Sequence, residues 1–349
     1  MKSRKFDSHR LALTCAAAAG LLSAFSFQQA FAETSADAAA APDAAARGVW
    51  AEFMKTNPSS EEGCFQASYP SYVWEKTACK VVHPKMALKK PAPGHLLVTG
   101  NGDDYVVQGT GLISETIGSF PTVSDVTSEK SAGVAAFGDG GILGTNEYSL
   151  QINTDFNGTT AACAGHSGCV VWQQFVYATD YETEGEAAVF IEYWLIGWGS
   201  SRCPSGWESD GEGDCVINSA ATTAPDVAPT TASLAKMTFS GSAVSGGNDT
   251  AVFNNGTTAY SLTAKDSVVD IAQVWQQSEF NIVGDAGGAR ADFNKGASIT
   301  VKVAVTDGST AAPSCVADSG TTGETNNLNL GSCTTASGST PSIQFTESD

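Results

Sequence analysis

The chain has 349 residues, of which 37 are acidic and 18 are basic, so its formal net charge at neutral pH is −19. This excess of negative charge argues against nucleic acid and against anionic membrane surfaces as partners. It suits an extracellular or acidic setting, where carboxylates are partly protonated and repel one another less.

Residues 1–32 have the pattern of a secretory signal peptide. Four bases within the first ten residues precede a short apolar run at 11–27, and Ala30-Phe31-Ala32 fits a small-x-small cleavage signal. The run is too short and too rich in Ala to favour a membrane-spanning helix. We therefore expect a secreted protein, extracellular or periplasmic, that is cleaved near Glu33 and has no membrane partner after export.

Residues 33–93 are predicted to be an N-terminal segment separate from the main domain at 94–349. The segment holds seven of the 14 bases that follow the signal peptide, whereas residues 94–349 hold 29 acids and seven bases. A neutral-to-basic segment before an acidic domain fits a pro-segment lying over an acidic cleft, and it fits a plain N-terminal extension equally well. Lys89-Lys90-Pro91-Ala92-Pro93 resembles a stiff linker that a protease could cut.

Eight cysteines follow the signal peptide, and an even number in an exported protein indicates disulfides. They fall into four close pairs, so local bridges are the simplest prediction. The predicted bridges are Cys64–Cys79, Cys163–Cys169, Cys203–Cys215 and Cys315–Cys333.

Residues 94–349 consist almost entirely of short alternating segments separated by turn residues, without a long helical period. This pattern predicts an all-β domain, a sandwich or a barrel. The predicted strands are Tyr105–Ser114, Glu147–Phe156, Cys169–Ala178, Ala187–Gly197, Ser233–Ser242, Thr250–Asn254, Ala259–Thr263, Val268–Val274, Gln277–Val283, Ser298–Thr306 and Ser342–Thr346.

Several of these strands place polar side chains on one face. A lone carboxylate in the middle of a strand, such as Glu279, is typical of a wet cleft or a site. For each strand taken alone, a solvated outer face is the simpler interpretation. The candidate residues are Gln151, Trp172, Gln174, Glu192, Trp194, Trp275, Glu279 and Asn281.

The order of the segments resembles that of the glutamic peptidases, the eqolisin family. Tyr148-Ser149-Leu150-Gln151 followed by Thr154-Asp155-Phe156 is similar to the family's LQTGVDF, which holds a catalytic Gln. Residues 278–283 and then 291–293 are similar to AEWIVE…ADF, whose first Glu is the catalytic acid. The resemblance runs from about Tyr105 to the end of the chain. It implies an antiparallel β-sandwich of the concanavalin or jelly-roll type, with Gln151 and Glu279 as catalytic residues.

The resemblance implies a secreted endopeptidase, a hydrolase that acts on polypeptides at acid pH, is made as a zymogen, works as a monomer and needs no cofactor. Glu279 would activate a water molecule and then protonate the leaving amine. The amide of Gln151 would donate a hydrogen bond to the oxyanion. The alternative is a non-catalytic β-sandwich that binds carbohydrate or protein through the same aromatic and amide face.

Other kinds of site are weaker alternatives. A glycosidase could use Glu192 and Glu279 as a carboxylate pair. Asp318-Ser319-Gly320-Thr321 mimics the signature of pepsin-like peptidases, but their mechanism needs two such aspartates. The few histidines, without a G-x-S-x-G motif, give little support for a Ser/His/Asp triad. No metal is expected, and the weak calcium candidate is the acidic loop with Asp210, Glu212 and Asp214.

Overall fold

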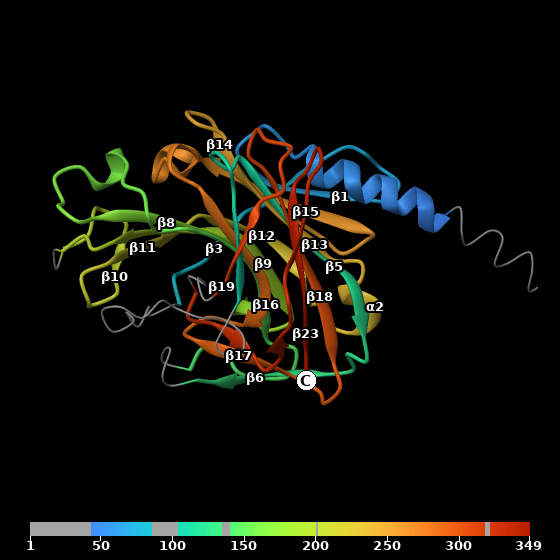
Figure 1. Ribbon diagram of the computed structural model, residues 1–349. Helices are drawn as coiled ribbons and strands as arrows, with labels where there is room; N and C mark the ends of the chain where they lie inside the picture. The colour runs from blue at the N-terminus through green and yellow to red at the C-terminus, as the bar shows by residue number, and fades with distance from the viewer. Residues whose placement is uncertain (1–42, 86–103, 135–139, 200–201, 318–321) are drawn as a thin grey trace, which may run out of the picture. The chain divides into compact units, whose positions relative to one another are not determined.

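The computed structural model describes residues 43–85, 104–134, 140–199, 202–317 and 322–349. The chain divides into two units, Met1–Ala46 and Arg47–Asp349, and every strand in the described ranges belongs to the second. Two large antiparallel sheets make this unit a β-sandwich, which confirms the predicted all-β class (Figure 1). No helix in these ranges is long and apolar enough to cross a membrane.

The first sheet has the strand order β2-β1-β15-β14-β13-β5-β18-β23-β21, and β22 also pairs with β23. Its strands are β1 (Gly63–Ser68), β2 (Glu75–Thr77), β5 (Glu115–Ser124), β13 (Thr238–Ala243), β14 (Asn248–Asn254), β15 (Thr258–Lys265), β18 (Ser298–Thr306), β21 (Asn329–Leu330), β22 (Thr334–Ala336) and β23 (Ser342–Ser348).

The second sheet has the order β10-β11-β9-β8-β7-β16-β4-β19, with β12 paired to β9 and β3 paired to β12. Its strands are β3 (Lys80–Val81), β4 (Tyr105–Gln108), β7 (Tyr148–Thr154), β8 (Val170–Thr183), β9 (Glu186–Ile196), β10 (Glu208–Ser209), β11 (Cys215–Asn218), β12 (Ala220–Pro225), β16 (Gln277–Gly284) and β19 (Ser314–Ala317).

Smaller elements complete the unit. The third sheet contains β20 (Thr325–Asn326), β17 (Ala289–Phe293) and β6 (Glu129–Gly133). The short helices are η1 (Ala161–Cys163), α2 (Thr231–Leu234), η2 (Asp266–Val268) and η3 (Ile271–Gln273). The strand predicted at Val268–Val274 is wrong, because this segment forms the 3₁₀ turns η2 and η3 instead.

Contacts with β5 of the first sheet set the orientation of β16, and among them the hydroxyl of Thr116 donates to that of Ser278 at 2.8 Å. Phe280 packs over Gly118 of β5, where an added Cβ would lie 2.2 Å from the Phe280 ring. The ring also lies 5.3 Å from that of Phe120. Because side chains alternate along a strand, the burial of Phe280 against the first sheet turns Glu279 and Asn281 to the opposite face of the second.

All four predicted disulfides are present: Cys64–Cys79, Cys163–Cys169, Cys203–Cys215 and Cys315–Cys333. Each bridge closes a local loop, and the longest has a sequence separation of 18 residues. Four bridges are typical of a protein that folds in an oxidising compartment, as expected for an exported chain.

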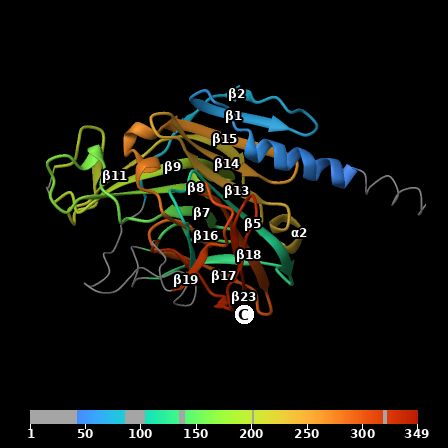
Figure 2. The same ribbon diagram turned by 45° about the horizontal axis from the view of Figure 1, so that its top comes forward.

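The N-terminal segment is not separate from the sandwich, contrary to the sequence-based prediction. β1 pairs with β15 from Gly63–Thr263 to Ser68–Thr258, so it extends the first sheet (Figure 2). β3 pairs in the same way with β12 of the second sheet. β1 buries Phe65, and its pairing with β15 gives it backbone hydrogen bonds that a separate unit of this size would lack. The signal peptide and the linker at 89–93 lie outside the described residues.

A buried polar cluster lies between the sheets. Asp249 of β14 and Asp266 of η2 are fully buried, together with Gln173 and Tyr193 from the second sheet. Asp266 accepts hydrogen bonds from the backbone N–H groups of Gly246 (3.3 Å) and Ala272 (3.1 Å). Burial, reinforced by the charge of Asp266, raises the pKa of Asp249 well above its ordinary value.

This cluster predicts that the fold is most stable in acid. The folded protein keeps a proton on Asp249 that the unfolded chain releases near pH 4. The contribution to stability is therefore complete below about pH 4 and is lost as the pH rises through the raised pKa. Asp249→Asn should make the melting temperature less dependent on pH between 4 and 8, and should stabilise the protein at pH 8 by roughly 1–3 kcal/mol.

The matched control is Asp125→Asn, at an exposed loop residue. Thermal unfolding measured across this pH range should be the same for Asp125→Asn and for the wild type. If the melting temperature of Asp249→Asn depends on pH as strongly as that of the wild type, Asp249 is not the group that makes the fold more stable in acid.

Candidate functional site

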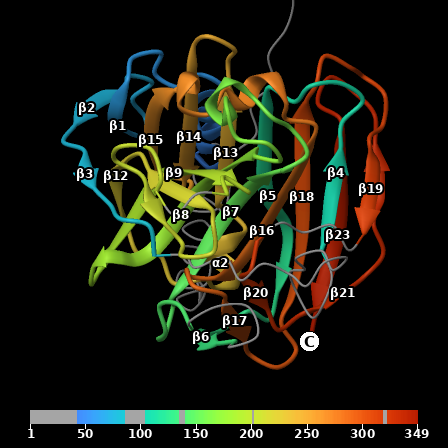
Figure 3. The same cartoon turned by 90° about the vertical axis from the view of Figure 1, so that its left-hand side faces the viewer.

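Four strands of the second sheet, β9, β8, β7 and β16, lie next to one another (Figure 3). A row of polar side chains crosses them. The register places Glu192 opposite Gln174, Gln174 opposite Asn153, and Asn153 opposite Glu279. Residues directly opposite each other in antiparallel strands share a face. This surface, the polar face, is the side of these strands opposite to Phe280 and Phe175, and β23 of the first sheet reaches it at Asn281.

Gln151 and Glu279 are diagonal neighbours on the polar face. Gln151 lies opposite Asn281 of β16, two residues from Glu279 along the same strand. Diagonal pairs of this kind lie about 7–8 Å apart, within reach of long side chains and a water molecule between them. The structure therefore brings together the two residues that the resemblance implied.

The side chain of Asp155 fixes the start of β16 against the end of β7. Its Oδ2 accepts hydrogen bonds from the backbone N–H groups of Gln276 and Gln277, both at 2.8 Å. The indole of Trp172 donates a hydrogen bond of 2.9 Å to the carbonyl oxygen of Thr154, which fixes the same corner from β8. Because these bonds set the register of β16, they also set the position of Glu279.

Three amides on the polar face are hydrogen-bonded to one another. The Oε1 of Gln151 accepts from the Nε2 of Gln174 (3.1 Å) and from the Nδ2 of Asn153 (3.4 Å). Its Nε2 donates to the hydroxyl of Ser149 at 2.9 Å. In this arrangement the NH₂ group of Gln151 is directed along β7 toward Ser149.

The polar face is closed in this structure. The exposed fractions of Glu279, Gln151 and Asn281 are only 1–2%. Glu324 is also buried, and burial raises the pKa of its carboxyl. A hydrogen bond with the side chain of Gln151 acts in the opposite direction and lowers this pKa. Its Oε1 accepts a hydrogen bond from the backbone N–H of Gly288 (3.1 Å). Gln151 and Glu279 are therefore covered in this structure.

Glu192 lies at the far end of the row from Glu279. Burial raises its pKa to about 8, although the indole N–H of Trp194 donates a hydrogen bond of 2.8 Å to its carboxyl. Three strand spacings of about 4.8 Å put the backbones of Glu192 and Glu279 about 14 Å apart. A glycosidase needs its two carboxyl groups within about 10 Å of each other, and two strands, β8 and β7, separate this pair.

Trp172 and Trp194 lie opposite each other on the polar face, with ring centroids 6.0 Å apart. Trp275 does not lie with them, contrary to the prediction. It precedes β16 and packs against Phe175, with centroids 5.7 Å apart, on the side of β8 that faces the first sheet. Strand alternation could not place Trp275, because the strand begins only at Gln277.

The remaining alternatives gain no support. The Oδ1 of Asp210 accepts from the backbone N–H groups of Glu212 and Asp214, which shapes the acidic loop. No group of three His, Cys, Asp or Glu side chains that could hold a metal occurs in the part of the chain that the structure describes. His166 stacks on the ring of Trp198, with centroids 3.2 Å apart. Asp318 lies outside the described residues.

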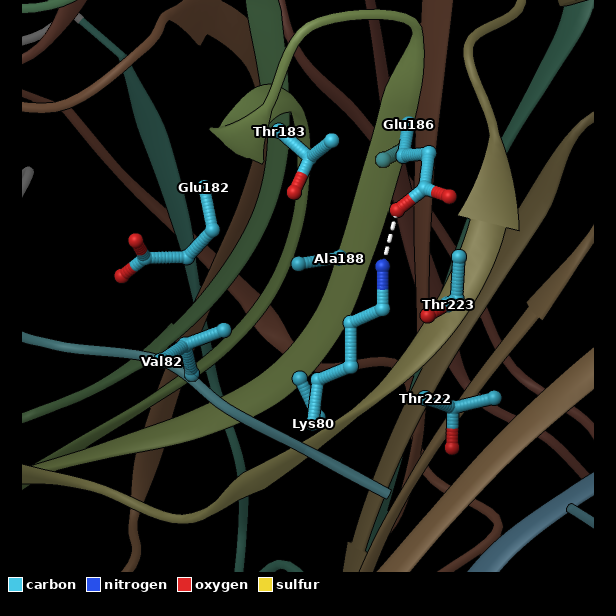
Figure 4. Close-up of a pocket in the computed structure, with 10 residues that line it drawn as sticks. Lys80, Val82, Glu182, Thr183, Glu186, Ala188, Thr222 and Thr223 are labelled. Atoms are coloured by element: carbon cyan, nitrogen blue, oxygen red, sulfur yellow. Dashed lines mark hydrogen bonds and ion pairs between the residues drawn. The ribbon is translucent and has the colours of Figure 1, made fainter. Parts of the chain in front are cut away.

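Two cavities lie away from the polar face. One has a free volume of about 10 Å³ and lies where β3 meets β9 and β12, with Lys80 paired to Glu186 (Figure 4). It holds one water molecule at most. The other, of about 240 Å³, lies on the first sheet and is lined by Lys55, Glu115 and Lys302 among others. Neither includes a residue predicted for the site.

Sequence reasoning missed three carboxyl groups beside the polar face: Asp104, Glu324 and Glu347. Each is buried, but each comes from a segment remote in sequence from β7 and β16, so no local pattern could have found it. Comparisons with known proteins add nothing further, since no protein-family model, curated protein or solved structure matches this chain.

The role of Asp155 predicts a specific loss of stability. Asp155→Ala removes three hydrogen bonds, from the backbone N–H groups of Asn157, Gln276 and Gln277, and should lower the free energy of unfolding by roughly 3 kcal/mol. Urea denaturation measures the change. The matched control is Asp292→Ala, at a nearby residue whose part-exposed carboxylate pairs with Arg290, and it should cost less than about 1 kcal/mol. Equal losses in both variants would show that Asp155 does not fix β16.

Proposed function

We propose that the protein is a secreted, acid-acting endopeptidase of the glutamic type, with its site on the polar face. The observation that carries the proposal is the placement of Glu279 and Gln151 as diagonal neighbours on one face of β16 and β7. This is the pairing of carboxyl and amide that peptide hydrolysis without a nucleophilic side chain requires.

In the proposed reaction, the carboxylate of Glu279 takes a proton from a water molecule, whose oxygen attacks the carbonyl carbon of the peptide. Negative charge then develops on the carbonyl oxygen, and the NH₂ group of Gln151 donates a hydrogen bond to it. Glu279 next gives its proton to the leaving nitrogen, and the C–N bond breaks. For this step the Gln151 amide must turn from Ser149 toward the substrate.

The surroundings of the two residues support this assignment. Asn153 and Gln174 donate hydrogen bonds to the Oε1 of Gln151, which keep the amide beside β16 before the turn that the reaction needs. Buried acids raise the stability of the fold at low pH, as the pKa of Asp249 indicates. A carboxyl that works as both base and acid is also suited to acid pH.

The test is cleavage of an unfolded protein substrate by the full secreted chain between pH 2 and pH 7. Glu279→Gln should lower the rate by roughly 10²–10⁴-fold, the usual effect of removing a general base. Gln151→Ala should lower it by roughly 10²–10³-fold, as for loss of an oxyanion donor. Both variants should keep the wild-type melting temperature within a few degrees.

The matched control is Glu184→Gln, at an exposed turn residue, which should cleave at the wild-type rate. A wild-type protein that is inert throughout this pH range, both before and after removal of residues 33–93, would contradict the proposal. It would favour a binding protein that uses the same face.

A further inference from the structure

One amide nitrogen connects two buried carboxyl groups beside the polar face. The Nδ2 of Asn281 donates to the Oε1 of Glu347 at 2.7 Å and to the Oδ2 of Asp104 at 3.1 Å. The other oxygen of Glu347 accepts from the Nδ2 of Asn326 at 3.0 Å. The exposed fractions of these four side chains are between 0 and 2%.

This cluster joins four segments that are distant in sequence. Asp104 precedes β4, Asn281 lies on β16, Asn326 is in β20, and Glu347 is on β23. β4 pairs with β16 only at Gln277 and Ser278, so the part of β16 that carries Glu279 and Asn281 has no ladder to β4. Along this part of β16, the Asn281 side chain provides a connection to β4 and β23.

The connection acts directly on the proposed catalytic pair. Asn281 lies opposite Gln151 in the β7–β16 ladder and two residues from Glu279. Asn326 also donates to the backbone carbonyl of Ile282 at 3.1 Å. A change in the hydrogen bonds of Asn281 therefore changes the position of β16 beside Gln151.

Other buried acids lie along the same part of the protein. The charge of Glu324, ahead of β20, acts on Asp285 at the β16–β17 turn, and the base that acts on Asp285 is Lys85. Burial raises the pKa of Glu347 to about 7, although Asn281 and Asn326 donate hydrogen bonds to it. Two carboxylates bonded to one nitrogen repel each other, so the pair holds its last proton at a higher pH than isolated acids would.

We propose that Asp104 and Glu347 are positioning residues of the site, which share one proton in acid and through Asn281 hold β16 in place beside Gln151. When the proton leaves, two negative charges face each other in a dry environment, and the contacts of Asn281 loosen. The contribution to local stability is complete below about pH 4.5 and is lost as the pH rises through about 7. The catalytic consequence rests on the proposed function, whereas the pH-dependent contact does not.

Hydrogen–deuterium exchange of the full secreted chain tests the contact without any need for activity. Rates are corrected for the intrinsic effect of pH and compared at pH 5 and pH 8 for amides of β16 and of residues 325–328. In the wild type, protection should fall by roughly 10²-fold, because the pKa of about 7 for Glu347 lies well above the ordinary value near 4.5. Strands β5 and β18 of the first sheet serve as the internal reference.

Two variants each replace one of the two carboxyl groups by a neutral amide, so that no proton has to be shared. In Asp104→Asn the side-chain oxygen can still accept from the Nδ2 of Asn281, as Asp104 does now, and the charge that repels Glu347 is removed. Glu347→Gln neutralises the other partner and is the second variant in case the first does not fold. Either should keep the protection of β16 at pH 8 within about twofold of its value at pH 5. The matched control is Asp226→Asn. Burial raises the pKa of Asp226 to about 7 as well, but this residue lies next to Asp180 and is not part of the cluster around Asn281. It should behave as the wild type.

The proposal is overturned if the protection of β16 in the wild type does not change between pH 5 and pH 8. It is also overturned if Asp104→Asn and Glu347→Gln lose protection as the wild type does. If the protein cleaves peptides, both variants should extend activity to higher pH, whereas Asp226→Asn should not. If the exchange results hold but no cleavage occurs, only the proposed function fails.

Discussion

The contact between Phe280 and Gly118 is the constraint on which the candidate site depends. Only a glycine leaves room for the aromatic ring at this point of the first sheet. Once Phe280 is buried there, the alternation of β16 leaves Glu279 and Asn281 on the opposite face, beside Gln151. A shift of one residue would exchange the two faces and place a carboxylate between the sheets, at a large cost in desolvation.

The second feature of the structure is its use of buried acids. Asp249 lies between the sheets, Glu192 lies at one end of the polar face, and Glu347 lies beside the other end, and burial raises the pKa of all three. Each group favours the folded state when it is protonated, so the whole protein is suited to low pH. The sequence, with 37 Asp and Glu residues, contains many acids, and some of them occupy these buried positions.

The sequence predicted those parts of the structure that depend on local patterns. Strand alternation and turn residues predicted the sandwich, and the close spacing of the cysteines predicted all four bridges. Gln151 and Glu279 were singled out because segment order, compared with a known family, carries information that composition does not, and their catalytic roles stay a prediction. The prediction that Trp275 lies on the polar face is wrong because this residue comes just before β16, so the alternation of that strand does not apply to it.

The remaining features depend on long-range contacts. The pairing of β1 with β15 joins residues about 200 positions apart, and hydrophobic alternation alone does not identify a partner strand. The same limit applies to Asp104, Asn281 and Glu347, which meet only because four segments converge. Their residue types are ordinary, and their significance appears only when the hydrogen bonds are known.

The central claim is that peptide hydrolysis takes place between Glu279 and Gln151. The most direct measurement is a crystal structure at acid pH with a peptide whose scissile carbonyl is replaced by a tetrahedral carbon bearing a hydroxyl group. We predict that this hydroxyl lies within hydrogen-bond distance of both the Glu279 carboxyl and the Gln151 amide. Binding of the peptide away from the polar face, or with its hydroxyl against Glu192 instead, would contradict the account.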